Sequence, residues 1–203
     1  TKIVGVQPHV VLEGVGGIQN VEEVKQLIES LGFSEIQSIA PFVQGQGIIR
    51  SARNAAGVVI KGVDPAREPM DLFKKHLKFG TLDLEDVVVA SEAGQTKQIG
   101  RVLLGEELAH RLHVSLGDMV SIISPAFDEE DPAKSIRNAK TGHFAVSGIF
   151  RLGMNDFDTG LALVHLNQAK GLYQLGDRVT GVSVRLSDPE LADQIRSSIQ
   201  GRF

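Results

Sequence analysis

The hydrophobic positions near the start of the chain follow first a strand period and then a helical one. A short apolar run predicts a strand over residues 9–12 that is buried on both faces. Apolar residues then recur at helical spacing from 21 to 31, directly after Asn20, a residue type favoured at helix N-caps. Gly32 ends this predicted helix, and residues 35–42 are expected to form the next strand. The chain therefore opens as strand–helix–strand.

The middle of the chain is richer in strand patterns. Residues 45–51 and 55–63 are expected to form two paired strands, and 70–77 a short amphipathic helix. A strand is also possible at 87–90, before the polar stretch 92–97, which is expected to be a loop.

A compact strand–helix–strand unit is expected between residues 100 and 125. The apolar run 101–104 ends at Gly105, and Glu106 and Glu107 follow where a helix N-terminus favours negative charge. A turn at 116–118 then leads into another strand. Nothing in this unit is typical of a nucleophile, a metal site or a phosphate-binding loop.

The last third repeats the pattern of the first. Its expected elements are a strand at 144–150, a strand at 161–164, a helix at 166–173, a strand at 179–186 and a helix from Pro189. Because the two ends carry like patterns around a β-rich middle, we expect an α+β fold in which the ends pair and the middle is an insertion.

Composition excludes several classes of function. The hydrophobic content of 42% is ordinary for a folded domain, and the net charge of −4 provides no electrostatic footprint for nucleic acid. The chain has no cysteine, so disulfides and thiolate chemistry are excluded. No apolar stretch approaches the ~18–20 residues of a membrane span. Because the chain starts at Thr1, we expect it to be a part of a longer protein.

Candidate catalytic and ligand sites are weak. Gly14 and Gly16 fit the start of a dinucleotide-binding motif, but Gln19 replaces its third glycine, so a loop between strand and helix is the better interpretation. His110 and His113 could share a helix face, yet a metal site needs a third ligand. No serine lies in a nucleophile-elbow motif. We therefore expect no catalytic residues, no metal and no cofactor.

Several short motifs carry a resemblance to a known family. In chain order they are Ile3-Val4-Gly5-Val6-Gln7-Pro8-His9, Gly62-Val63-Asp64-Pro65, Leu104-Gly105-Glu106-Glu107-Leu108-Ala109, Gly117-Asp118, Ser124-Pro125, Gly148-Ile149-Phe150 and Gly153-Met154-Asn155-Asp156-Phe157-Asp158. In this order and spacing the chain resembles the periplasmic domain of lipoprotein-releasing ABC transporter permeases of the LolC/LolE type, within the MacB/FtsX superfamily.

The resemblance implies a two-part fold and a set of partners. A discontinuous porter subdomain would comprise residues 1–50 and 150–203, and a β-rich sabre subdomain residues 51–149. The full protein would lie in the inner membrane with this domain in the periplasm. Its partners would be a cytoplasmic ATPase subunit, a second permease subunit, and a periplasmic lipoprotein chaperone or the lipoprotein cargo. The domain itself would be non-catalytic.

The resemblance also implies a partner-binding loop at 125–141. The segment has no consistent period, and a connection this long inside a compact domain is usually functional or disordered. Its acidic run could also collect Ca²⁺, but it lacks the alternating ligands and the glycine of a calcium loop. The expected partner-binding residues are Pro125, Phe127, Asp128, Glu129, Glu130, Asp131, Pro132, Ile136, Arg137 and Lys140.

The segment departs from the family's hook pattern, in which a Pro-Arg pair stands where this chain has Ala139-Lys140. The alternatives are therefore a partner-type subunit whose hook does not engage the chaperone, or a MacB-type efflux or mechanotransmission permease. A stand-alone α/β enzyme is the alternative from another class.

Overall fold

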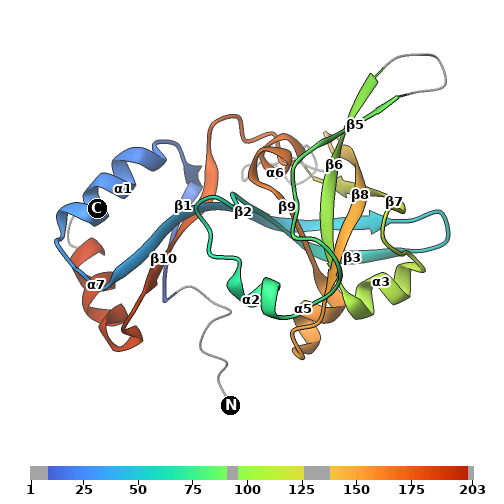
Figure 1. Cartoon of the computed structure of the whole chain (residues 1–203). Helices are drawn as coiled ribbons and strands as arrows, with labels where there is room; N and C mark the ends of the chain where they lie inside the picture. Colours follow the sequence, from blue (N-terminus) through green and yellow to red (C-terminus); the bar gives the residue numbers. More distant parts are fainter. Residues whose placement is uncertain (1–8, 91–95, 126–137, 201–203) are drawn as a thin grey trace.

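The computed structural model describes residues 9–90, 96–125 and 138–200 (Figure 1). Its strands are β1 (Val10–Ile18), β2 (Ile36–Arg50), β3 (Ala55–Val63), β4 (Leu77–Gly80), β5 (Val87–Ala90), β6 (Thr96–Gly105), β7 (Met119–Ser124), β8 (Lys140–Phe150), β9 (Leu161–His165) and β10 (Val179–Leu186). Its helices are α1 (Val21–Ser30), α2 (Asp71–Lys75), α3 (Glu106–Leu112), α5 (Asn155–Gly160), α6 (Leu166–Leu172), the 3₁₀ helix η1 (Pro189–Leu191) and α7 (Ala192–Gln200). The expected mixture of helices and strands is confirmed.

Most strands pair along one path, in the order β1–β10–β2–β3–β9–β6–β8–β4. Strand β7 pairs with both β2 and β8, so the strands β2, β3, β9, β6, β8 and β7 form a closed circuit. The pairs β3–β9 and β6–β8 are parallel, and the other pairs are antiparallel. Closure removes free edges from this part of the sheet, and its apolar side chains pack with α3 and α6 in one hydrophobic core.

A second hydrophobic core lies at the other end of the molecule, where β1 and β10 meet α1 and α7 (Figure 1). The alternation of β10 places Val182 and Val184 on the face that α1 and α7 cover, and both side chains are fully buried. Helix α1 supplies Val24 and Ile28 to this core. We call β1, β10, α1 and α7 the terminal layer, because it joins the two ends of the chain.

Strand β2 belongs to both parts of the molecule. It runs for 15 residues without interruption, about 50 Å at ~3.3 Å per residue. Its first half pairs with β10 and its second half with β3 and β7. The prediction of separate strands at 35–42 and 45–51 was wrong, because Val43 and Gln44 continue the pairing between them. The predicted pairing of 45–51 with 55–63 is confirmed. A Cβ at Gly45 would lie 2.5 Å from Cζ of Tyr173, so the glycine makes room for that ring.

Strand β1 differs from its prediction in two ways. It continues through the glycine-rich stretch up to Ile18, where a loop was expected, and its pairing with β10 shifts register between Glu13 and Ile18. Gly16 and Gly17 have φ values of 76° and 84°, which glycine adopts readily, and they absorb this irregularity. The strand is also not buried on both faces, because Val11 is 41% exposed. The glycine-rich stretch is therefore part of a strand and not the loop that a dinucleotide-binding motif requires.

The division into porter and sabre subdomains stays a prediction. The residues of the terminal-layer core come from the two ends of the chain, between Val10 and Ile39 and between Val182 and Ile199. Residues of β9 and α6, which fall within the predicted porter range, pack in the core of the closed circuit. Among the described residues, no helix combines the length and the apolar character needed to cross a bilayer.

Gly62 sets how closely α6 approaches β3. A Cβ at Gly62 would overlap the Cβ of Ala169 and lie 3.4 Å from the Cα of Leu166. We expect Gly62→Ala to lower the free energy of unfolding by about 1–3 kcal/mol, the usual cost of overpacking. The additional substitution Ala169→Gly removes the overlapping atom and should restore part of that loss. Chemical denaturation of both variants measures this, and a double variant less stable than Gly62→Ala would contradict the packing explanation.

Candidate functional site

The base of the 125–141 loop is the candidate site, and strands β7 and β8 position it. They pair in antiparallel register from Met119 with Ala145 to Ser124 with Lys140, where the loop begins and ends. Alternate residues of β7, Val120, Ile122 and Ser124, are buried. The strands are therefore fixed by their packing up to the last pair before the loop.

Consecutive residues at the end of α6 hold this base in place. Ser124 is fully buried, and its Oγ donates a hydrogen bond of 2.8 Å to the carbonyl of Leu172. Gln174 donates from Nε2 to the carbonyl of Asn138 at 2.7 Å, on the other side of the loop. The side of the loop that leaves β7 and the side that enters β8 are thus tied to the same helix terminus.

Tyr173, between these two anchors, connects the helix terminus to β2. Its hydroxyl donates a hydrogen bond of 3.0 Å to the carbonyl of Gln46, and the side chain is 3% exposed. Burial raises the pKa of the Tyr173 hydroxyl far above its ordinary value of 10.0, so the hydroxyl stays protonated and remains a donor. No sequence pattern around Tyr173 predicted this role. The signal available was that Tyr173 is the single tyrosine of the chain.

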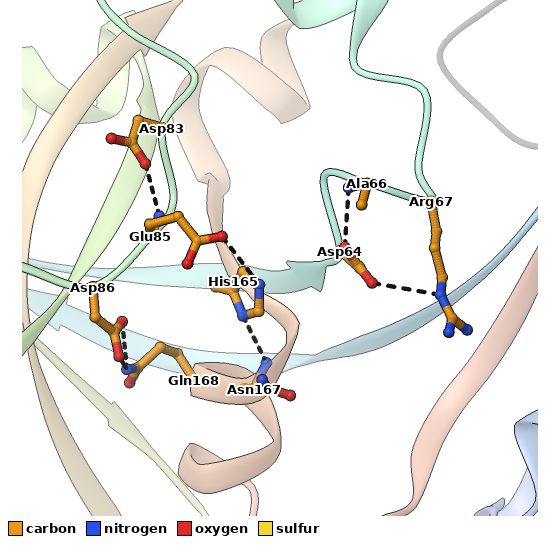
Figure 2. A network of polar contacts seen from close by, with 9 residues as sticks. All are labelled: Asp64, Ala66, Arg67, Asp83, Glu85, Asp86, His165, Asn167 and Gln168. Atoms are coloured by element: carbon orange, nitrogen blue, oxygen red, sulfur yellow. Dashed lines mark hydrogen bonds and ion pairs between the residues drawn. The ribbon is translucent and has the colours of Figure 1, made fainter.

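The start of α6 is held from the segment between β4 and β5 (Figure 2). Gln168 donates from Nε2 to both carboxylate oxygens of Asp86, at 2.7 and 2.8 Å. The backbone N–H of Asn167 donates to Nδ1 of His165, so the ring proton of the neutral imidazole lies on Nε2, which faces Oε1 of Glu85 at 3.9 Å. These contacts fix α6 at the end opposite to the loop base. No motif in the sequence predicted this network.

A further structural site lies in the turn after β8. The carboxylate of Asp158 is 5% exposed and accepts the backbone N–H groups of Leu152 at 2.7 Å and Gly153 at 2.8 Å. Gly105 lies against the same turn, because a Cβ there would lie 2.6 Å from the carbonyl oxygen of Phe157. The motifs around residues 104–109 and 153–158 therefore meet in space, where they join α3 to α5.

Of the predicted partner-binding residues, the structure describes only those at the two ends of the loop. Pro125 is half-buried directly after β7, and Lys140 is exposed at the start of β8. The other predicted residues, Phe127, Asp128, Glu129, Glu130, Asp131, Pro132, Ile136 and Arg137, lie outside the described residues. The acidic run weighed as a calcium ligand lies there too.

The geometry around the two histidines of α3 does not favour a metal. His110 lies in the last turn of the helix, while His113 follows it with a φ of 54°, in the left-handed region. In residues 9–90, 96–125 and 138–200, no group of three or more His, Asp or Glu side chains comes together as a metal site would require. What the described part of the candidate site can do is hold Ser124 and Asn138, on the two sides of the 125–141 segment, at the end of α6.

Comparison with protein families identifies what the chain is similar to. The family model described as the MacB-like periplasmic core domain matches residues 2–202. The lipoprotein-releasing system transmembrane protein LolC of Neisseria meningitidis is 27% identical over 206 residues, which cover 98% of this chain and 45% of the relative. LolC of Xylella fastidiosa is 28% identical over 169 residues, which cover 83% of this chain and 37% of the relative. The chain spans less than half the length of these relatives.

Solved structures of low sequence identity share the fold. The periplasmic region of MacB from Actinobacillus actinomycetemcomitans has a TM-score of 0.55 at 18% identity, covering 95% of this chain and 80% of that one. The extracellular domain of the ABC-type transporter YknZ from Gram-positive bacteria has a TM-score of 0.50 at 15% identity, covering 93% and 86%. These similarities confirm the expected fold class.

Proposed function

Because the chain belongs to the family of MacB-like periplasmic core domains, we propose that it is the periplasmic domain of a lipoprotein-releasing ABC transporter permease. In this role the full protein is embedded in the inner membrane beside a second permease subunit. A separate cytoplasmic subunit hydrolyses ATP, and this domain converts the resulting movement into release of lipoproteins. The domain performs no catalysis and binds no nucleic acid.

One observation carries the proposal. The LolC relative of Neisseria meningitidis, named for lipoprotein release, aligns with 98% of this chain. The anchored loop base adds a physical reason for a handover role. Ser124 and Asn138 are both hydrogen-bonded to the end of α6, and a segment held at both ends loses less entropy when it binds a partner.

The 125–141 loop is the proposed site for a periplasmic lipoprotein chaperone. Phe127 is its large apolar side chain, and aromatic anchors carry a disproportionate share of interface energy. The run from Asp128 to Asp131 adds salt-sensitive steering toward a basic partner.

Shortening the loop tests this assignment. We expect replacement of the residues between Ala126 and Lys140 by a Gly-Ser linker to weaken binding of the cognate chaperone at least about tenfold, or 1.4 kcal/mol. Pull-down followed by titration calorimetry measures the change. The matched control is Val88→Ser. This substitution alters a side chain that is 68% exposed on strand β5, and it leaves the 125–141 loop intact.

The outcomes separate the alternatives. Equal binding before and after shortening would exclude the loop as the chaperone site. A parent domain that binds no chaperone would remove the handover role and favour a partner-type subunit or an efflux permease. Phe127→Ala on the intact loop then distinguishes the aromatic anchor from the acidic steering, because only the steering weakens with added salt.

A further inference from the structure

The turn that follows β3 is built to present two charged side chains next to each other. Oδ1 of Asp64 accepts the backbone N–H of Ala66 at 3.0 Å. The carbonyl of Asp64 accepts the N–H groups of Arg67 at 3.0 Å and Glu68 at 2.8 Å. The turn is therefore closed by its backbone and by the Asp64 carboxylate, whose Oδ2 also lies 3.6 Å from Nε of Arg67 (Figure 2).

Glu68 reaches one face of the terminal layer. Its side chain is buried, Oε2 accepts a hydrogen bond of 3.0 Å from Oγ of Ser183, and Oε1 lies 4.0 Å from Nη2 of Arg185. Ser183 and Arg185 alternate with Val184 along β10, so they lie on the face opposite to α1.

Arg67 reaches the other face. Its Nη1 donates a hydrogen bond of 3.1 Å to Oε1 of Glu22 in α1, the helix that packs on the Val184 face. Arg67 also lines a crevice with Ile39 of β2 and Phe33. Arg67 and Glu68 are consecutive residues of one turn. They thus contact the molecule on opposite faces of the sheet formed by β2 and β10.

The turn lies at the point where the two parts of the molecule are joined by β2. Strand β3 pairs with β2 only as far as Phe42, and β2 continues beyond that point with β10 on its other side. Bending of β2 near Phe42 would change the angle between the terminal layer and the closed circuit of strands. The 64–68 turn lies beside Phe42. It contacts β10 through Glu68 on one face of the sheet and α1 through Arg67 on the other.

The negative charge of the Glu68 carboxylate acts on two neighbouring cations, Lys61 and Arg185. Burial lowers the pKa of Lys61 from its ordinary value of 10.5, the nearby Glu68 carboxylate opposes this shift, and Arg185 adds to it. The carboxylate therefore lies within the fields of two cations. Without it, the half-buried Lys61 and Arg185 would lose a negative charge that stabilises both.

We propose that the 64–68 turn is a clip that makes the terminal layer and the closed circuit of strands move as one body. The inference rests on the proposed role of the domain in transmitting movement. The clip holds the angle at which movement of the terminal layer reaches the base of the 125–141 loop.

Pulsed electron–electron double resonance, which measures the distance between two spin labels in frozen protein, tests the clip directly. The chain has no native cysteine, so spin labels can be placed on Gln26→Cys in α1 and Glu107→Cys in α3, both exposed positions. We expect a single narrow distribution of label-to-label distances in the parent. In Arg67→Ala/Glu68→Ala we expect this distribution to become broad or bimodal. The matched control is Asp193→Ala/Arg196→Ala, which removes an exposed ion pair within α7 and should keep the narrow distance.

Glu68→Gln keeps the proposal testable if the double variant fails to fold, as judged by circular dichroism. It retains an acceptor for Ser183 but removes the charge, and we expect a partial broadening. A distribution equal to that of the parent in the folded double variant, or in Glu68→Gln where the double variant is unfolded, would overturn the clip. The measurement contains no chaperone or lipoprotein, so its failure is distinct from failure of the proposed function.

Discussion

Val184→Asp should unfold the two ends of the chain together. Val184 is fully buried in the terminal-layer core and pairs with Val10 of β1 on the neighbouring strand. An unpaired carboxylate in such a core costs about 3–5 kcal/mol, a large fraction of the ~5–15 kcal/mol that stabilises a typical domain. Because α1 packs on the same core, the loss should reach residues far from position 184 in the sequence.

Hydrogen exchange followed by mass spectrometry measures this coupling. We expect the amides of α1 and β1 to lose protection together with those of β10. The matched control is Val11→Asp, which places the same charge on β1 at a position that is 41% exposed and should change stability little. If α1 stayed protected in Val184→Asp, the ends of the chain would not share one folding unit.

Asp158→Ala should be the next most damaging of these substitutions. It removes the carboxylate that accepts the N–H groups of Leu152, which is buried, and Gly153, and it leaves both donors without that partner. Hydrogen bonds to charged groups contribute about 1.5–3 kcal/mol each, so we expect a loss of about 3 kcal/mol or more. At ~2–4 °C per kcal/mol for a domain of this size, the melting temperature should fall by about 6–12 °C.

The neighbouring acid provides the control for this prediction. Asp156→Ala alters an exposed carboxylate of the same short helix, α5, and should shift the melting temperature by less than the buried substitution. Asp158→Asn keeps one acceptor oxygen and should fall between the two. Equal melting temperatures for Asp156→Ala and Asp158→Ala would show that the turn does not need its carboxylate.

The loop site and the clip depend on different parts of the fold. Ser124, Tyr173 and Gln174 hold the loop base to the end of α6 and to β2. The clip acts on the opposite half of β2, where that strand pairs with β10. Strand β2 thus connects the terminal layer to the loop base, as the proposed transmission of movement requires.

Local elements were predictable from the sequence because their determinants lie a few residues apart. Asn20 was predicted as an N-cap, and its side chain accepts the backbone N–H of Glu23 at 3.4 Å. The alternation over 179–186 predicted β10 and its buried face correctly. The motifs carried the family resemblance, which the match over residues 2–202 confirms.

The sequence predicted the pairing of 45–51 with 55–63, but tertiary structure decided the partners that lie far apart in the chain. Nothing local places β10 between β1 and β2, or closes a circuit through β7. The glycines at 14–17 were interpreted as a loop, yet they continue β1, and a Cβ at Gly17 would lie 3.0 Å from the carbonyl oxygen of Val179 in β10.

The candidate site divides in the same way. The loop at 125–141 stays a prediction from a polar, aperiodic stretch between two strong strands. The anchors of its base at Leu172 and Gln174 depend on contacts with residues 48 and 36 positions away, which the fold brings together. Glu68 and Ser183, 115 positions apart, are likewise joined by the fold. Periodicity encodes which face of an element is buried, but the choice of partner depends on packing and hydrogen bonding that exist only once the whole chain is folded.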